Sequence, residues 1–196
     1  MYKRQPKNVG STDDLDYIIY TSGTTGMPKG VMVKDSSLVN YIQTAIETYV
    51  GNDVLSFALF TSPAFDLTLT SIFTPLLSGN KIVAYNDKHK DFLIEKIFED
   101  NQVDIIKLTP SHLKMLKEKA NDPSIKEASR IRKFIVGGEA FSADLATEIN
   151  EIYNGKVELY NEYGPTEATI GCMVHRFNSS SDNRLSVPVG LSLIHI

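Results

Sequence analysis

The sequence predicts an α/β fold with a largely parallel sheet flanked by helices. Short apolar runs rich in β-branched residues alternate along the chain with longer segments in which apolar residues recur every three or four positions. The longer segments have the length of the helical crossovers that parallel strands require. Hydrophobic residues make up 42% of the 196 residues, so the chain can bury a sizeable core.

The first two strands and the first helix are expected within the first fifty residues or so. "LDYIIY" (15–20) holds two aromatic and two β-branched residues, and we predict that it is a buried strand. A second short strand is expected at 31–33. A helix follows it, with Ser36 as the expected N-cap and Gly51 as the expected stop, because the apolar residues between them have helical spacing.

The rest of the chain repeats this alternation of strand and helix. The expected strands are 54–60, 81–85, 103–108, 131–137 and 156–161, and the expected helices are 66–77, 90–100, 110–121 and 142–153. In an open parallel sheet, ligands bind beyond the carboxyl ends of the strands. We therefore expect the functional residues in the loops that follow these strands.

Charge and composition exclude several classes of protein. Twenty basic and 24 acidic residues give a net charge of −4 without a long block of either sign, so we expect no nucleic-acid partner. No apolar stretch reaches the roughly 18 residues of a membrane span, and the amino terminus lacks the layout of a secretion signal. Cys172 is the single cysteine, so no internal disulfide can form. We expect a cytoplasmic protein without a membrane partner.

"YTSGTTGMPKG" (20–30) combines four serine or threonine hydroxyls, three glycines and one lysine directly after an expected strand. Glycines let several backbone N–H groups approach one anion, and the hydroxyls and the lysine add donors and charge, so the segment is suited to bind phosphate. It is not a Walker loop, because counting from Gly23 puts Pro28 at the second glycine and Gly30 at the magnesium-binding hydroxyl. A metal must then be held elsewhere. The alternative interpretation is a flexible polar turn.

Three segments together resemble the adenylate-forming, or AMP-binding, enzyme superfamily. "YTSGTTGMPKG" is similar to its phosphate-loop motif, "NEYGPTEAT" (161–169) to its second nucleotide motif, and "AFDLTLT" (64–70) to a motif of its nonribosomal peptide synthetase branch. They lie in the expected order, and the resemblance covers roughly residues 12–191. It implies a fragment of the large N-terminal core of an adenylate-forming enzyme.

The resemblance also implies an activity. Such domains use ATP and Mg²⁺ to activate an amino acid as an aminoacyl adenylate, which is then loaded onto the phosphopantetheine of a partner carrier protein. The implied partners are the amino acid and the carrier-protein and condensation domains of a multidomain synthetase. The alternatives are an acyl- or aryl-CoA ligase of the same superfamily and a non-catalytic nucleotide-binding module.

The implied nucleotide site draws on both nucleotide motifs and on "GGEA". The resemblance places Thr21, Ser22, Gly23, Thr24, Thr25, Gly26 and Lys29 at the phosphates, and Gly138, Glu139, Ala140, Asn161, Tyr163 and Gly164 around adenine. Thr166 would contact the α-phosphate, and Glu167 would hold Mg²⁺, a cation that prefers carboxylate oxygen. The implied catalytic residues are Lys29, Thr166 and Glu167.

Asp66 follows a phenylalanine at an expected helix start. A carboxylate there either caps the helix or meets a buried cation. The resemblance implies the second role, with the α-ammonium group of an amino acid as the cation. Relatives that act on fatty or aryl acids have no ammonium group to bind.

The resemblance further implies a selectivity pocket of nine residues. These are Asp66, Leu67, Thr70, Lys107, Ile135, Gly137, Glu162, Ile170 and Gly171. Lys107 can only donate and an ionised Glu162 can only accept, and a carboxamide satisfies both, so L-asparagine is the expected substrate. Glutamine is the second candidate, disfavoured only by its longer side chain. Aspartate is disfavoured because its negative charge would lie against that of Glu162. The alternative for the pair is an ordinary salt bridge.

Three further expectations concern a histidine and the ends of the chain. We expect a capping or packing role for His112 rather than that of a general base. Residues 6–191 are expected to be a partial AMP-binding adenylation domain, and residues 1–5 and 192–196 to be non-native ends. Because a complete domain is longer, we expect these 196 residues alone to be inactive.

Overall fold

The computed structural model describes residues 10–23, 26–86, 93–119, 125 and 130–192. In this part of the chain a seven-stranded sheet has the order β4-β3-β5-β6-β7-β8-β9. The strands from β4 to β7 in this order pair in parallel, and β8 and β9 are antiparallel to their neighbours. The predicted α/β class with a largely parallel sheet is confirmed.

The five expected strands after the first helix are present, with bounds that differ by a few residues. They are β3 (Ser56–Leu59), β4 (Lys81–Ala84), β5 (Ile105–Leu108), β6 (Lys133–Val136) and β7 (Glu158–Tyr163). The antiparallel strands β8 (Met173–Arg176) and β9 (Leu191–Ser192) were not predicted. Both are too short for a recognisable apolar pattern, and they form by pairing with the edge of the finished sheet.

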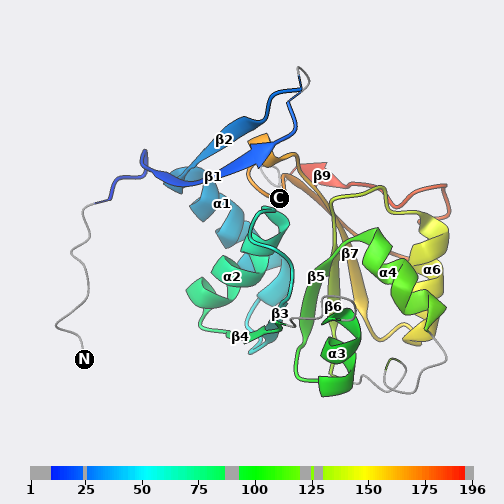
Figure 1. The fold of residues 1–196 in the computed structure, drawn as a ribbon. Coiled ribbons are helices and arrows are strands. Elements are labelled where there is room, and N and C mark those ends of the chain that lie inside the picture. Colours follow the sequence, from blue (N-terminus) through cyan, green and yellow to red (C-terminus); the bar gives the residue numbers. More distant parts are fainter. Residues whose placement is uncertain (1–9, 24–25, 87–92, 120–124, 126–129, 193–196) are drawn as a thin grey trace, which may run out of the picture.

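Helices cover both faces of the sheet (Figure 1). One layer holds α1 (Asp35–Ala45), the π-helical turn η2 (Ile46–Val50) and α2 (Leu67–Ser78), and the other holds α3 (Leu93–Asp100), α4 (Pro110–Glu118) and α6 (Ala143–Ile152). Each layer packs on its own apolar cluster, because successive residues of a strand point to opposite faces. Ile105 and Ile135 face the first layer, and Ile106 and Phe134 face the second.

The first two strands form a separate antiparallel hairpin, β1 (Leu15–Thr21) and β2 (Lys29–Lys34). The prediction of a buried first strand is therefore wrong. Ile19 and Val33 on the inner face are buried, whereas Ile18, Tyr20 and Met32 on the outer face are 52%, 73% and 65% exposed. A two-stranded sheet covered on one side buries only alternate residues.

The N-cap of α1 differs from the prediction, whereas the predicted stop of the helical segment at Gly51 is confirmed. Lys34 is the N-cap, so Ser36 lies inside the helix and does not cap it. The amide groups of Asp35 and Ser36 donate instead to backbone carbonyls of residues 14 and 12, which replaces a side-chain cap. Gly51 ends the helical segment with a φ of 60°, as predicted.

Two remaining expectations concern membranes and the chain ends. None of the helices in the described ranges has the length and apolar character needed to cross a bilayer. Residues 1–5 and 193–196 lie outside the described residues. Ser192 belongs to β9 and pairs with Met173.

Candidate active site

Two cavities lie at the carboxyl edge of the parallel strands. The larger has a volume of about 640 Å³ and lies between the loop after β3 and the first turns of α4. The smaller has a volume of about 440 Å³ and lies between the loop after β6, the end of β7 and residues 186–189. Gly138 and Glu139 line both, so the cavities are neighbours. This edge is where the strand pattern predicts a ligand site.

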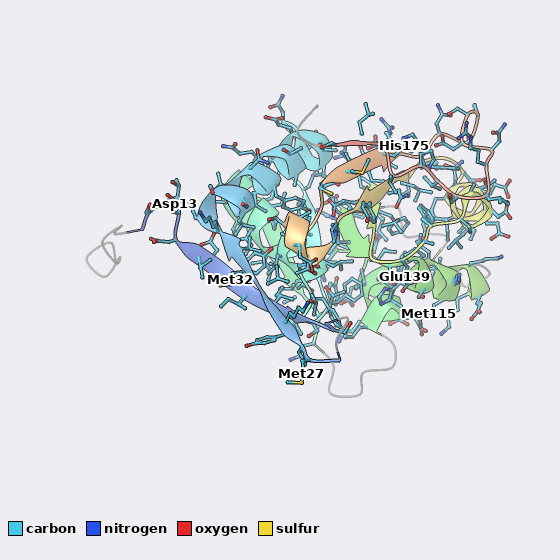
Figure 2. All side chains as sticks on the ribbon, turned by 90° about the horizontal axis from the view of Figure 1, so that it is seen from above. Asp13, Met27, Met32, Met115, Glu139 and His175 are labelled. Atoms are coloured by element: carbon cyan, nitrogen blue, oxygen red, sulfur yellow. The ribbon has the colours of Figure 1, made fainter. Side chains whose placement is uncertain are left out.

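The α4 wall of the larger cavity contains His112 and Met115, and Glu139 lines the same cavity (Met115 and Glu139 are labelled in Figure 2). His112 Nδ1 accepts from the backbone N–H of Thr109 at 3.2 Å, and the Thr109 side chain accepts from the His112 N–H, which completes a capping box. The expected capping role of His112 is confirmed. Burial lowers the pKa of His112, and Glu139 opposes this. The hydrogen bond from Ser111 Oγ to Glu139, at 2.6 Å, is the main reason that the pKa of Glu139 is low.

Asp66 and Leu67 line the larger cavity at the start of α2. Asp66 occupies the N-cap position, but its side chain makes no capping hydrogen bond. The Asp66 Oδ2 atom is buried and has no hydrogen-bond partner among the described residues. The negative charge of Asp66 acts on two neighbours. Burial lowers the pKa of Lys107, and Asp66 partly opposes this. Burial raises the pKa of Tyr17, and Asp66 raises it further. The capping alternative is therefore excluded, and a buried carboxylate oxygen is left for a cation.

The smaller cavity gathers the residues that the resemblance places around adenine. Its lining includes Gly138, Glu139, Ala140, Asn161, Tyr163 and Gly164. Asn161 uses Nδ2 to donate to the backbone oxygens of Val187 and Pro188, each at 3.0 Å, which leaves Oδ1 to accept from a ligand. Tyr163 is 50% exposed. The cavity thus offers an acceptor and an accessible aromatic ring to a base.

A buried polar network lies between the sheet and the layer of α1, η2 and α2. Lys107 on β5 and Glu162 on β7 form an ion pair, and each side chain is 2% exposed. Glu162 Oε1 also accepts from the hydroxyls of Tyr41 at 2.9 Å and Tyr49 at 2.6 Å. Tyr41 Oη lies 2.6 Å from Thr70 Oγ1. Burial lowers the pKa of Lys107, while direct contact with the Glu162 carboxylate favours the charged ammonium.

The remaining members of the nine-residue set surround this network. A Cβ atom on Gly171 would lie 2.6 Å from Glu162 Cδ, and one on Gly137 would lie 2.9 Å from the Glu162 backbone oxygen, so only glycine fits at both places. Ile135 and Ile170 belong to the apolar cluster on the same side of the sheet. Ile170 has a φ of 65°, a strained conformation for a β-branched residue. The nine residues therefore lie in one region of the molecule.

The expected phosphate loop joins β1 to β2, and Met27 lies close to the tip of this hairpin (Figure 2). The Gly26 N–H donates to the Gly23 oxygen at 2.9 Å, and Gly26 has a φ of 82°, a conformation that favours glycine. Thr24 and Thr25 lie outside the described residues.

The second nucleotide motif lies beside this hairpin. Thr21 pairs with Lys29 across the strands, Ser22 follows Thr21, and the side chains of Ser22 and Lys29 are exposed. The short helix η3 (Thr166–Ala168) packs against β2. Thr166 and Glu167 are thus brought next to the strand that carries Lys29.

Glu167 suits the magnesium ion that the resemblance implies. Its side chain is exposed, and the described residues contain no cluster of three or more His, Cys, Asp or Glu that could hold a metal ion by themselves. Mg²⁺ is usually held by one or two carboxylates together with phosphate oxygens and water. One carboxylate beside a phosphate loop fits that pattern.

Sequence reasoning missed Tyr41 and Tyr49 as parts of the site. Tyr49 lies at an apolar position of the helical pattern between residues 36 and 51, and neither tyrosine was singled out as a site residue. The only available signal was a pair of hydroxyl groups on an otherwise apolar helix face, since buried tyrosine hydroxyls usually have a partner.

The chain is similar in sequence to known proteins. A sequence model of the family described as AMP-binding enzyme matches residues 2–196. Bacitracin synthase 3 of Bacillus licheniformis is 50% identical over 182 residues, and tyrocidine synthase 3 of Brevibacillus parabrevis is 48% identical over 179 residues. These alignments cover 92% and 91% of this chain but only 3% of each relative.

A solved structure shows the same fold. The Vibrio cholerae adenylation domain AlmE, in complex with glycyl-adenosine-5'-phosphate, matches with a TM-score of 0.82 and 28% identity. The match covers 93% of this chain and 34% of the AlmE chain. The resemblance to adenylation domains of peptide synthetases is confirmed, and this chain belongs to the AMP-binding enzyme family.

Proposed function

We propose that this chain is the central part of an enzyme that activates an amino acid with ATP. A carboxylate oxygen of the amino acid attacks the α-phosphorus, a new P–O bond forms, and the bond to pyrophosphate breaks, so the aminoacyl adenylate and pyrophosphate are the products. The observation that carries the proposal is the buried, unpartnered Oδ2 of Asp66. An α-ammonium group is the cation that an amino acid, and no fatty or aryl acid, would bring to it.

The chemistry needs alignment and charge neutralisation more than covalent help. Backbone N–H groups of the loop between β1 and β2 and the ammonium of Lys29 would hold the β- and γ-phosphates. Thr166 on η3 would donate to the α-phosphate. Glu167 would hold Mg²⁺, which neutralises phosphate charge when it is bound.

We propose L-asparagine as the amino acid. The side-chain carboxamide has one acceptor for a Lys107 N–H, and one of its N–H donors can reach the single lone pair that Glu162 retains after its contacts with Lys107, Tyr41 and Tyr49. Glutamine needs a deeper pocket, and aspartate would bring a second negative charge to Glu162. Lys107 and Glu162 contact each other directly, as an ordinary salt bridge also would, so the substrate profile is the deciding measurement.

The parent protein is proposed to be a cytoplasmic multidomain synthetase. The curated relatives are many times longer than this chain, which leaves room for carrier-protein and condensation domains. The adenylate would pass its aminoacyl group to the thiol of a phosphopantetheine on such a carrier. We propose no nucleic-acid or membrane partner.

Amino-acid-dependent exchange of labelled pyrophosphate into ATP tests the proposal on the full-length parent protein. We expect the highest rate with L-asparagine, a lower rate with glutamine, and little exchange with aspartate. A maximum with a large apolar amino acid would refute the asparagine assignment. Exchange with no amino acid, but with an aryl or fatty acid, would refute amino-acid activation itself.

A further inference from the structure

We propose that Tyr41 and Tyr49 are positioning residues that set side-chain selectivity by holding the Glu162 carboxylate in one orientation. The inference rests on the proposed function, because it concerns the same pocket. It adds two residues that lie outside the nine-residue set.

The two hydroxyls meet at one atom. Tyr49 Oη donates to Glu162 Oε1 at 2.6 Å and Tyr41 Oη donates to it at 2.9 Å. Lys107 contacts the other carboxylate oxygen, Oε2. Since Tyr41 gives its only hydrogen to Glu162, the 2.6 Å contact with Thr70 makes the Thr70 hydroxyl the donor to Tyr41. A directional chain of hydrogen bonds therefore ends on the carboxylate.

Burial keeps both tyrosines in the donor form. It is the largest cause of the raised pKa of Tyr41 and of Tyr49, so neither loses its proton near neutral pH. Hydrogen bonds to an ionised acceptor are roughly twice as strong as neutral ones, and those at Oε1 favour the charged carboxylate. The two hydroxyls thus fix Oε1, and Oε2 is left on the side of Lys107.

The helix that carries the two tyrosines is shaped to bring them together. On a continuous α-helix, residues eight positions apart are rotated by about 80° from each other. The segment from Ile46 to Val50 is π-helical, with the Gly51 N–H bonded to the Ile46 oxygen at 2.8 Å. A π-turn has about 4.4 residues per turn, which removes most of that rotation and brings Tyr41 and Tyr49 to one face. Lys133 Nζ holds this end by donating to the Tyr49 backbone oxygen at 2.8 Å.

Other buried tyrosines show that packing alone does not produce this arrangement. Tyr85 and Tyr153 lie in the cluster on the opposite face of the sheet, and their hydroxyls have no hydrogen-bond partner among the described residues. Tyr153 packs edge-on against Phe134, with ring centroids 5.5 Å apart. It is the matched control, because its change to phenylalanine removes a buried hydroxyl on the opposite face of the sheet from Tyr41 and Tyr49.

The test compares Tyr49→Phe, Tyr41→Phe and Tyr153→Phe in the full-length parent protein, by pyrophosphate exchange. For the two pocket variants we expect the KM for the preferred amino acid to rise about tenfold or more, because each loses a hydrogen bond to a charged group. The KM for ATP and the maximal rate should stay within about twofold, and discrimination against the next-best amino acid should fall. The Tyr153 variant should match the unaltered protein.

A second measurement separates positioning from packing. In a background with Lys107→Met and Glu162→Leu, Tyr49→Phe should no longer change discrimination, because the side-chain oxygens that it positions are gone. Equal losses in both backgrounds, or pocket variants that behave like Tyr153→Phe, would overturn the inference while amino-acid exchange by the unaltered protein upholds the proposed function. Absence of exchange with every amino acid would remove both.

Discussion

At the proposed floor of the substrate pocket, Lys107 and Glu162 are each 2% exposed and form an ion pair, and Glu162 also accepts from the hydroxyls of Tyr41 and Tyr49. At the tip of the β1–β2 hairpin, Lys29 is exposed and Met27 is 72% exposed. We propose that both regions contact polar groups of a ligand. The floor has already lost its water, whereas the hairpin remains hydrated.

This difference separates two ways of recognising a ligand. A desolvated pocket floor discriminates by the free-energy penalty of leaving one of its buried donors or acceptors unpaired by the ligand. An exposed loop with a lysine and accessible backbone N–H groups binds any phosphate of the right charge. Its electrostatic attraction to the phosphate becomes strong only when water is excluded around it. We therefore assign selectivity among amino acids to the floor, and triphosphate binding to the hairpin.

The largest expected effect is on the free energy of unfolding and comes from removing the ion pair between Lys107 and Glu162. Glu162→Ala leaves the Lys107 ammonium buried without its partner, and removing one member of a buried ion pair costs about 3–5 kcal/mol. Denaturant unfolding of the parent protein should show this loss. The double variant Lys107→Met with Glu162→Leu should recover most of it, because an apolar pair needs no partner. A loss below about 1 kcal/mol for Glu162→Ala would show that the floor is hydrated.

The next effect is on activity and comes from the hairpin. Lys29→Ala should lower the rate of pyrophosphate exchange about 100-fold or more, since it removes a charge that stabilises the transferring phosphates. Because the side chain is exposed, the unfolding midpoint should not move. Lys34→Ala on the same strand is the control, because Lys34 pairs with Asp13 outside the loop. Equal losses for the two variants would contradict a phosphate role for Lys29.

The smallest expected effect concerns His112, which is half-buried and so lies between the buried pocket floor and the exposed hairpin in its contact with water. Its pKa is lowered by burial, so the unfolded state binds the proton more readily and the cap loses stability as the pH falls below about 6.5. Amide exchange of α4, corrected for the intrinsic rate, should be faster at acidic pH than at neutral pH. His112→Gln keeps an acceptor for the Thr109 N–H but cannot titrate, so it should abolish the dependence. Helix α6, capped by Ser142, should show none.

Much of the site could be predicted because its parts are local. The glycine turn, the Asp66 segment and the strand-to-loop transitions at Gly138 and Tyr163 each fit within a few residues, and their periodicity and turn chemistry are visible in a short window. The α/β class follows from the same alternation. Resemblance to a family then assigned roles that composition alone does not contain.

The tertiary structure decided what depends on partners that are distant in sequence. The sequence around Tyr49 does not indicate that its hydroxyl donates to Glu162, 113 positions away. A tyrosine on an apolar helix face has the same local sequence pattern whether or not its hydroxyl makes a hydrogen bond. The same holds for the exposed outer face of β1 and for the short strands β8 and β9. Burial and strand pairing depend on which segments the helical crossovers bring side by side. Sequence alone therefore determined the individual helices, strands and motifs, and tertiary packing determined which buried polar groups contact each other.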